Sequence, residues 1–191
     1  SRMEDIILVG YGGHARSVAD CIERAGIYRI IGYTDTVCYE TNYTYLGTDE
    51  VLEQYRGKGI KNAFVAIGYM GKGNLREKLY NKLKKLDFIL PSVVDPSAII
   101  SASAEINEGS FIGKGAIINA EARIGKMCMI NTRALIEHEC CIDDFSHIAV
   151  GAVLCGQVFI GCNSFIGANA TIIQNIKLPE CTFVPAGKVI R

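Results

Sequence analysis

Two adjacent residues, His138 and Glu139, have the side chains needed for proton transfer. A histidine titrates near neutral pH and can remove a proton from an attacking group, and a neighbouring carboxylate makes it a better base by stabilising the imidazolium. Cys140 and Cys141 follow directly, so a thiolate nucleophile is the alternative. The repeat containing these residues turns Cys140 inward, so we favour His138 as a general base.

A second candidate site is the glycine-rich segment 10–15, which reads Gly-Tyr-Gly-Gly-His-Ala and follows the apolar run Ile6–Val9. When such a segment joins a strand to a helix, backbone N–H groups at the helix start can hold a diphosphate. Asp35 ends the next expected strand and can accept a hydrogen bond from a ribose or a base. His14 can donate to a diphosphate or sugar; the alternative is a loop histidine in water.

Three ligand interpretations of this glycine segment are open. A nucleotide-linked sugar is favoured, NAD is a second possibility, and a tight strand-to-helix turn that binds nothing is the third. NAD is less favoured because the remainder of the chain would have to supply a site for a hydride acceptor, and a repetitive β-helix is a poor source of one.

Residues 3–90 alternate between strand and helix patterns and predict a small, doubly wound, Rossmann-like α/β domain. The expected strands are 6–9, 30–34, 63–67 and 88–90. One helix is expected to bury Val18, Cys21, Ile22 and Ala25 and to stop at Gly26. The other is expected over 75–86 with Leu75, Leu79, Leu83 and Leu86 on its inner face.

Residues 91–191 have a different period. From Ile100 to Ile190 every sixth residue is Ile, Leu or Val, and the fourth residue of each repeat is usually small. This period predicts a β-helix in which both positions point inward, three repeats form one triangular coil, and about five coils stack. Residues three repeats apart stack, so Gly156 is expected beside His138, with its N–H facing a developing oxyanion.

Composition excludes several partners and cofactors. Lys+Arg and Asp+Glu are balanced at 20 each, which gives no basic surplus for nucleic acid or an anionic membrane. No apolar run approaches a membrane span, and the start lacks a signal-peptide pattern. The 8 cysteines form no C-x-x-C pair and only 3 histidines are present, so we expect no metal site and a reducing, cytoplasmic location.

Three features together resemble one enzyme family: Gly-Gly-His-Ala after the first strand, the six-residue repeat, and Asn-Thr-x-Ala-x-Ile-Glu-His-Glu at 131–139. They resemble the sialic acid O-acetyltransferase / nucleotide-aminosugar N-acetyltransferase family over nearly the whole chain. The resemblance implies a left-handed parallel β-helix and a homotrimer with active sites between subunits. It implies acetyl-CoA-dependent acetylation of the C4 amine of a nucleotide-linked 4-amino-4,6-dideoxy sugar, as in UDP-N,N′-diacetylbacillosamine synthesis, for bacterial surface glycans.

The resemblance also implies roles for particular residues. His138 is the base, assisted by Glu139. The nucleotide sugar would be bound by Gly12, Gly13, His14, Asp35, Thr36 and Asn74. Acetyl-CoA would be contacted by Asn131, His147, Ala168 and Ala186. Asn131 is also expected to be a polar neighbour of His138, and His147 is expected near a corner of the coil.

One departure from the family pattern concerns the last coil. The segment 178–184 runs almost directly into Pro185, so the coil is expected to be shortened and the contact of Ala186 with acetyl-CoA weakened. Two alternative functions remain: an O-acetyltransferase acting on sialic acid or a polysaccharide hydroxyl, and a catalytically silent, sugar-nucleotide-binding trimer.

Overall fold

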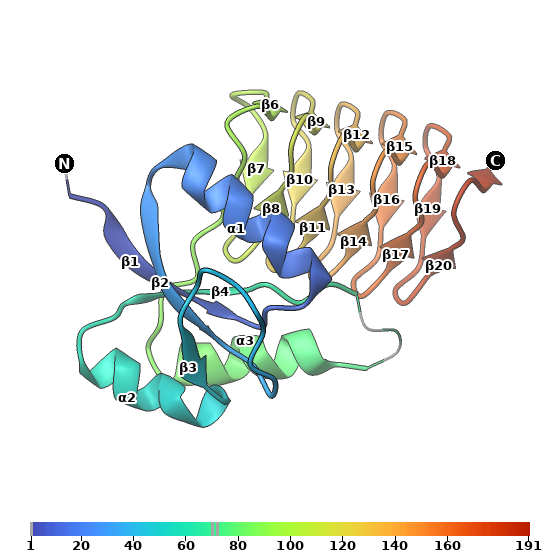
Figure 1. Cartoon of the computed structure of the whole chain (residues 1–191). Coiled ribbons are helices and arrows are strands. Elements are labelled where there is room, and N and C mark those ends of the chain that lie inside the picture. The colour runs from blue at the N-terminus through green and yellow to red at the C-terminus, as the bar shows by residue number, and fades with distance from the viewer. Residues whose placement is uncertain (1, 70, 72) are drawn as a thin grey trace. The chain divides into compact units, whose positions relative to one another are not determined.

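The computed structural model describes residues 2–69, 71 and 73–191, which form two compact units that divide between Pro91 and Ser92 (Figure 1). The first unit is an α/β domain and the second is a parallel β-helix, as the two periods in the sequence predict. None of the helices in the described ranges is both long and apolar enough to cross a membrane.

The first unit contains one parallel sheet with the strand order β3-β2-β1-β4. Its elements are β1 (Glu4–Val9), α1 (Gly13–Ala25), β2 (Tyr28–Thr34), β3 (Tyr45–Gly47), the 3-10 helix η1 (Asp49–Val51), α2 (Leu52–Gly57), β4 (Asn62–Val65) and α3 (Leu75–Lys85). The helix α1 lies on one face of the sheet, and α2 and α3 lie on the other (Figure 1). The central strand β1 is fully buried from Ile6 to Leu8.

The prediction of a full strand over 88–90 is wrong. These residues form only a single parallel bridge, between Ile89 and Asn62, next to the exposed Asp87. The sequence patterns do not predict β3, η1 and α2. β3 has only three residues, and all are half-buried, so it lacks the apolar run that identifies the central strands.

Gly10 and Gly26 bound the first helix for conformational reasons. Gly10 has φ +91°, and a Cβ there would lie 2.5 Å from Cγ1 of Ile67. Only glycine fits this turn, which leads from β1 to α1. Gly26 adopts the left-handed conformation and donates its N–H to the carbonyl of Ile22 at 3.2 Å, so the predicted helix stop is confirmed.

The inner face of α3 differs from the expected one. Leu79 and Leu83 are buried, but Leu75 is 41% exposed and Leu86 is half-buried. Arg76 takes the buried place instead and is only 8% exposed. Leucine spacing alone could not reveal this, because a guanidinium on a long stem can be buried where a polar neighbour stabilises it.

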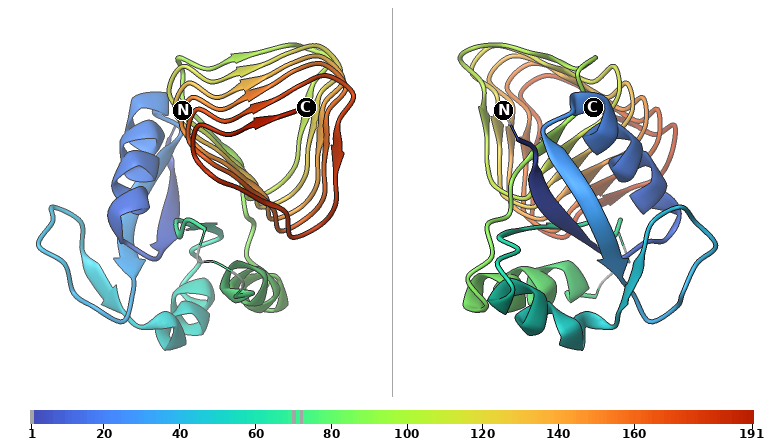
Figure 2. Two further views of the ribbon diagram at one scale, coloured as in Figure 1. Left: turned by 90° about the vertical axis from the view of Figure 1, so that its right-hand side faces the viewer. Right: turned by 60° about the vertical axis from the view of Figure 1, so that its left-hand side comes forward.

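The second unit is a triangular coil of short strands in three parallel sheets, seen along its axis in the left view of Figure 2. The first sheet contains β5 (Val93–Val94), β8 (Phe111–Ile112), β11 (Met129–Ile130), β14 (His147–Ile148), β17 (Phe165–Ile166) and β20 (Phe183–Val184). The second contains β6 (Ile99–Ile100), β9 (Ile117–Ile118), β12 (Leu135–Ile136), β15 (Val153–Leu154), β18 (Thr171–Ile172) and β21 (Val189–Ile190). The third contains β7 (Glu105–Ile106), β10 (Arg123–Ile124), β13 (Cys141–Ile142), β16 (Phe159–Ile160) and β19 (Lys177–Leu178).

The core of the coil consists of the two inward positions predicted from the repeat. The six-residue aliphatic series and the small residues such as Ala116 and Ala134 form one buried cluster. Where the small residue is serine, its hydroxyl is satisfied; Ser146 donates to the carbonyl of Gly161 at 3.0 Å. The ladder stays in register to the last strand, where Ile190 pairs with Ile172.

Candidate active site

A pocket of about 520 Å³ lies in the first unit, at the carboxyl ends of β1, β2 and β4. Ligands in open parallel sheets bind at this end of the strands. Its lining includes most of the residues predicted to bind a nucleotide sugar: Gly12, Gly13, His14, Asp35 and Thr36. Asn74 is absent from the lining and lies exposed at the N-cap of α3, so its contact with substrate stays a prediction.

The start of α1 is open on the side of this pocket. A Cβ added to Gly12 or Gly13 would meet no protein atom within 4 Å, so packing does not require glycine there. The N-terminus of α1 also lacks a side-chain cap. Free space in front of uncapped N–H groups at the positive end of a helix suits an anionic group such as a diphosphate.

Asp35 connects the two loops that border the pocket. One carboxylate oxygen accepts the N–H of Tyr11 at 2.8 Å, and the other accepts the N–H of Thr36 at 2.7 Å. The aspartate therefore holds the glycine segment against the end of β2. Each carboxylate oxygen can accept a further hydrogen bond, so contact with a ribose or base stays a prediction.

His14 is partly buried, so its interpretation as a water-exposed loop histidine is wrong. Loss of solvation by burial, and then the positive charge of Arg76, lower the pKa of His14 from 6.5 to about 4. At neutral pH the imidazole is consequently uncharged and carries one N–H that can be donated to a ligand.

We expect His14 to make the stability of the first unit depend on pH. Between pH 6.5 and about 4, the unfolded chain binds a proton at His14 that the folded chain rejects, so the free energy of unfolding falls as the pH falls. The full loss is at most about 3 kcal/mol. Urea unfolding at several pH values measures this loss of unfolding free energy. Tyrosine fluorescence reports on the first unit, because all 9 tyrosines precede residue 81 and tryptophan is absent.

The matched control is His14→Gln, which keeps a hydrogen-bonding side chain but cannot titrate. Its unfolding free energy should fall less than that of the wild type between pH 7 and pH 4.5. Equal pH dependence of the two proteins would show that His14 is not the group responsible.

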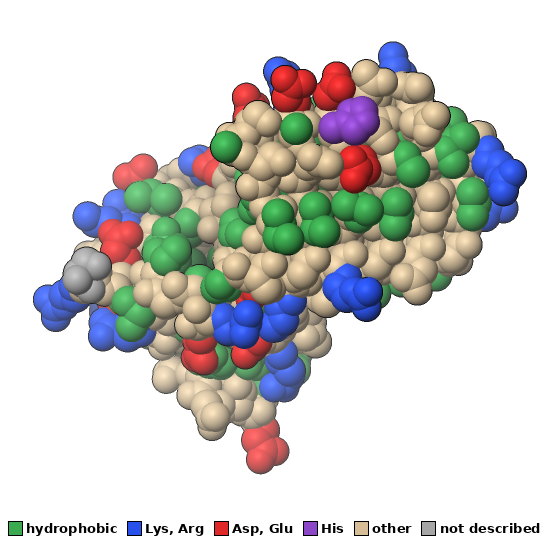
Figure 3. Space-filling model, turned by 90° about the horizontal axis from the view of Figure 1, so that it is seen from above, with side chains coloured by type: hydrophobic (Ala, Val, Ile, Leu, Met, Phe, Trp, Pro, Cys, Tyr) green, Lys and Arg blue, Asp and Glu red, His purple; other side chains and the backbone are tan. Residues whose placement is uncertain are grey.

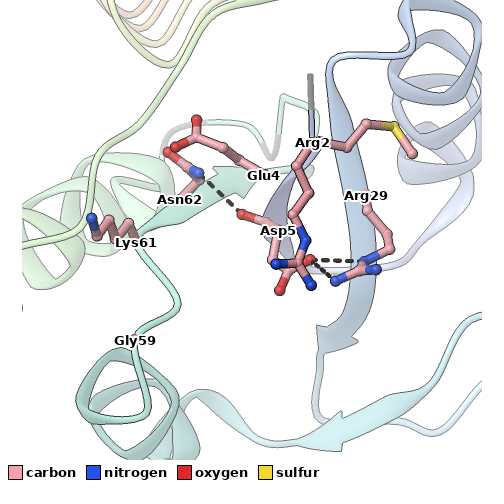
Figure 4. A pocket seen from close by; sticks show the side chains of 8 residues that line it. Arg2, Glu4, Asp5, Arg29, Gly59, Lys61 and Asn62 are labelled. Atoms are coloured by element: carbon pink, nitrogen blue, oxygen red, sulfur yellow. Dashed lines mark hydrogen bonds and ion pairs between the residues drawn. The ribbon is translucent and has the colours of Figure 1, made fainter.

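A second hollow, of about 260 Å³, lies at the opposite, amino ends of the same strands (Figure 4). Two of its polar side chains are engaged by Asp5: Arg29 forms an ion pair with the carboxylate at 2.7 Å, and Asn62 donates to the backbone carbonyl at 3.0 Å. None of the residues predicted to bind substrate lines it. The larger pocket is therefore the better candidate for ligand binding.

His138 and Glu139 form a contact in the second unit, in the turn after β12. Nδ1 of His138 lies 3.1 Å from Oε1 of Glu139, and Gln157 donates to the other carboxylate oxygen at 3.4 Å. The imidazole is about half exposed. With the proton on Nδ1, the lone pair lies on Nε2, which is the arrangement that a general base requires.

Gly156 stacks on His138, as the repeat predicts. A Cβ at Gly156 would lie 2.5 Å from Nε2 of His138. The missing side chain therefore leaves space for the imidazole and brings backbone close to the atom that would accept the proton.

The cysteines beside His138 are poorly suited to nucleophilic attack. Cys140 is fully buried, as predicted, and its thiol donates to the carbonyl of Cys155 at 3.0 Å. Burial raises the pKa of Cys140 to about 11, so it is a thiol at neutral pH. Burial also raises the pKa of Cys141.

The structure pairs Asn131 with His147 and not with His138. Nδ2 of Asn131 lies 2.7 Å from Nε2 of His147, whose ring centroid is 5.1 Å from that of Phe165. Asn131 follows β11 and His138 follows β12, so they occupy different corners of the coil. The corner position expected for His147 is wrong as well, because His147 lies in β14 and is buried.

Two further residues predicted to contact acetyl-CoA lie one coil apart. Ala168 is half-buried and its carbonyl accepts the N–H of Gly187 at 2.8 Å, whereas Ala186 is exposed. Their contacts with acetyl-CoA stay predictions. Within residues 2–69, 71 and 73–191, no group of three His, Cys, Asp or Glu side chains could hold a metal ion.

The pocket is also lined by residues that the sequence motifs do not single out. Tyr39, Asp49 and Leu79 all border it. A signal was present for Tyr39, because tyrosine is unusually frequent between residues 33 and 45. Without the fold, nothing in that segment shows which of its tyrosines faces the pocket.

Comparison with known proteins gives consistent matches. Residues 5–83 match the model of the PglD N-terminal domain. The GDP-perosamine N-acetyltransferase of Caulobacter crescentus, in a histidine-to-alanine variant complexed with CoA and GDP-perosamine, has 30% identity and a TM-score of 0.93, covering 100% of this chain and 90% of that one. The acetyltransferase domain of PglB from Neisseria gonorrhoeae has 29% identity and a TM-score of 0.92, covering 98% and 91%.

Proposed function

The chain belongs to the hexapeptide-repeat acetyltransferase family that includes GDP-perosamine N-acetyltransferase and the PglB acetyltransferase domain, and from this premise we propose that it transfers an acetyl group from acetyl-CoA to the amine of a nucleotide-linked sugar. We further propose that the amine is the C4 amine of a 4-amino-4,6-dideoxy sugar used for bacterial surface glycans. Complexes of the relatives with CoA, acetyl coenzyme A and GDP-perosamine support both substrate classes.

The observation that carries the proposal is the arrangement of His138 between Glu139 and Gly156. Nδ1 faces a carboxylate, while Nε2 is next to a residue without a side chain. This leaves the basic nitrogen accessible to an acceptor amine. In the Caulobacter enzyme, variants with one histidine replaced by alanine or asparagine have been solved with CoA and GDP-perosamine, which suits a catalytic histidine.

The proposed reaction is direct transfer in a ternary complex. The sugar nitrogen attacks the thioester carbonyl and forms the C–N bond, and Nε2 of His138 takes the proton that the nitrogen loses. Glu139 stabilises the resulting imidazolium. The N–H of Gly156 stabilises the tetrahedral oxyanion until the C–S bond breaks and CoA leaves as the thiol, taking up the proton.

The pocket of the first unit would hold the nucleotide part of the acceptor. The diphosphate would bind at the open start of α1, where Gly12 and Gly13 leave room for it. His14 would donate its N–H to the diphosphate or the sugar, and Asp35 and Thr36 would contact the nucleoside. Bound this way, the nucleotide anchors the sugar and leaves the amine to react.

We also propose that the protein is a homotrimer. The outward positions of the sheet containing β12 form an apolar row of Ile99, Ile117, Leu135 and Val153, which continues past Thr171 to Val189, and Ile99 is 64% exposed. Figure 3 shows hydrophobic side chains in a row on the coil surface, with a histidine beside them. Leu135 belongs to the same strand that His138 follows, so a second copy on this face would lie next to the base.

Sedimentation should give a trimer for the wild type and monomers for Val153→Glu, because the substitution places a charge in the apolar row.

Incubation of the protein with acetyl-CoA and GDP-, UDP- and dTDP-linked 4-amino-4,6-dideoxy sugars tests the proposed activity. We expect thiol release and a gain of one acetyl group on one of these sugars, stable to mild hydroxylamine because it is an amide. The matched control acceptor carries a C4 hydroxyl. Transfer to that control or to free sialic acid, with a hydroxylamine-sensitive product, would indicate an O-acetyltransferase. Nucleotide binding without CoA binding would indicate a silent trimer.

A further inference from the structure

Five tyrosines gather where β2 ends: Tyr11, Tyr33, Tyr39, Tyr43 and Tyr45. The rings of Tyr11 and Tyr33 are stacked at 4.6 Å, and the ring of Tyr39 lies 6.2 Å from that of Tyr33. Tyr39 and Tyr43 belong to the segment 36–44 between β2 and β3, which is neither helix nor strand. Side chains therefore have a large part in determining the shape of this segment.

The hydroxyl of Tyr33 makes the main contact with the middle of the segment. It accepts the N–H of Tyr39 at 2.7 Å and can donate to the carbonyl of the same residue at 3.4 Å. Tyr33 is fully buried in β2, so it is a rigid support. Burial raises the pKa of Tyr33, so the hydroxyl keeps its proton.

Three other tyrosine hydroxyls of the cluster bond to residues other than Tyr39. That of Tyr45 donates to the carbonyl of Asp35 at 2.9 Å. Tyr11 contacts the Thr41 hydroxyl at 2.9 Å, and Tyr43 donates to Glu23 at 2.6 Å. Tyr39 differs from Thr41 and Tyr43 because it lines the 520 Å³ pocket. The contact from Tyr33 is therefore the one that determines where an aromatic ring stands in the pocket wall.

The chemistry of this wall suits the base of a nucleotide. In parallel α/β sheets with a diphosphate at the first helix, the nucleoside lies toward the end of the second strand, where Asp35 and Tyr39 are. An aromatic ring offers a flat face on which a base can stack, a contact typically worth a factor of about 5 to 100 in affinity.

We propose that Tyr33 is a positioning residue for the nucleotide sugar, which acts by holding Tyr39 in the pocket wall against the base. This inference rests on the proposed function. The proposed role concerns only the acceptor substrate. The KM for the nucleotide sugar should therefore depend on Tyr33, whereas kcat and the KM for acetyl-CoA should not.

Tyr33→Phe tests the inference, with Tyr43→Phe as the matched control. Both variants remove one hydroxyl that bonds within the same region. The partner of Tyr33, Tyr39, lines the pocket, whereas the partner of Tyr43, Glu23, does not. We expect Tyr33→Phe to raise the KM for the nucleotide sugar about 10-fold, because the backbone N–H of Tyr39 loses its partner. Tyr43→Phe should leave this KM within about 2-fold. No rise for Tyr33→Phe, or an equal rise for acetyl-CoA, would overturn the inference.

Tyr39→Ala provides a second, independent variant that keeps the backbone groups bonded to Tyr33. It should raise the same KM, and adding Tyr33→Phe to it should have little further effect, because the ring that Tyr33 positions is gone. A Tyr39→Ala enzyme with a wild-type KM would refute the inference even if Tyr33→Phe failed to fold.

Calorimetry with nucleoside diphosphates and with inorganic diphosphate separates this inference from the proposed function. Tyr33→Phe should lose about 10-fold in affinity for the nucleoside diphosphate and none for inorganic diphosphate. If the wild type binds no nucleoside diphosphate, the proposed function fails. If wild type and Tyr33→Phe bind it equally, the role of Tyr33 fails and the function stands.

Discussion

Replacing His138 with alanine is expected to lower kcat by about 10²–10⁴-fold, which is the usual contribution of a general base. The change removes the only group in the turn after β12 that pairs a basic nitrogen with a carboxylate, through its 3.1 Å contact with Glu139. The KM values should change little, because the proposed sites for the nucleotide and for CoA lie on other residues. Steady-state kinetics with acetyl-CoA and the accepted nucleotide sugar would measure both parameters.

Cys140→Ala is the matched control for this experiment. It alters a neighbour of Glu139 whose thiol is buried and protonated, so turnover should stay near that of the wild type. Near-normal turnover of the His138→Ala enzyme would contradict the base assignment. Loss of turnover in Cys140→Ala, without loss of stability, would favour a covalent route through the thiol.

Replacing Gly156 with alanine is expected to lower kcat by about 10²-fold while the protein stays folded. The new Cβ would lie 2.5 Å from Nε2 and 2.6 Å from Cε1 of His138, so the imidazole has to move. It can do so at low cost because it is about half exposed. Displacement of a catalytic group by about 1 Å typically costs this much in rate. Activity and thermal unfolding, measured on the same preparation, would test both parts.

The double variant His138→Ala with Gly156→Ala shows whether the glycine acts through the histidine. Added to His138→Ala, the Gly156 change should cause little further loss, because no imidazole remains to be displaced. An equally large further loss would mean that the added methyl group disturbs the site independently of the histidine, since the alanine retains the backbone N–H. Full activity of Gly156→Ala by itself would show that the imidazole does not need the space left by the missing side chain.

The stacking of His138 on Gly156 was predictable because it depends on a local period. In a coil of six-residue repeats, each residue has neighbours at a constant separation along the chain, so one correct register places all of them. The inward position of Cys140 and the core positions of Ile136 and Ile142 follow from the same register. The glycine turn at Gly10 is predictable for a related reason, since residue type and backbone conformation are linked within a few residues.

The surroundings of the two other histidines were not predictable in this way. Burial is the main cause of the low pKa of His14, and the positive charge of Arg76, which lies on another element far away in the sequence, lowers it further. His147 contacts Asn131 and Phe165 on neighbouring coils. The six-residue repeat specifies which side chains point inward, but it does not specify which side chains cover the outward side of a strand. Such environments depend on which surfaces pack together and on the charges that the packing buries.

The sequence by itself therefore determined the two kinds of fold, the glycine turn before α1 and the histidine–glycine pair on the coil. In each case the information lies in a short repeat or a turn, where chain geometry restricts the conformation. Only the tertiary structure decided the state of His14, the partner of His147 and the place of Tyr39 in the pocket wall. Those properties arise from contacts between elements that are distant in sequence, and burial and hydrogen bonding there are set by three-dimensional packing.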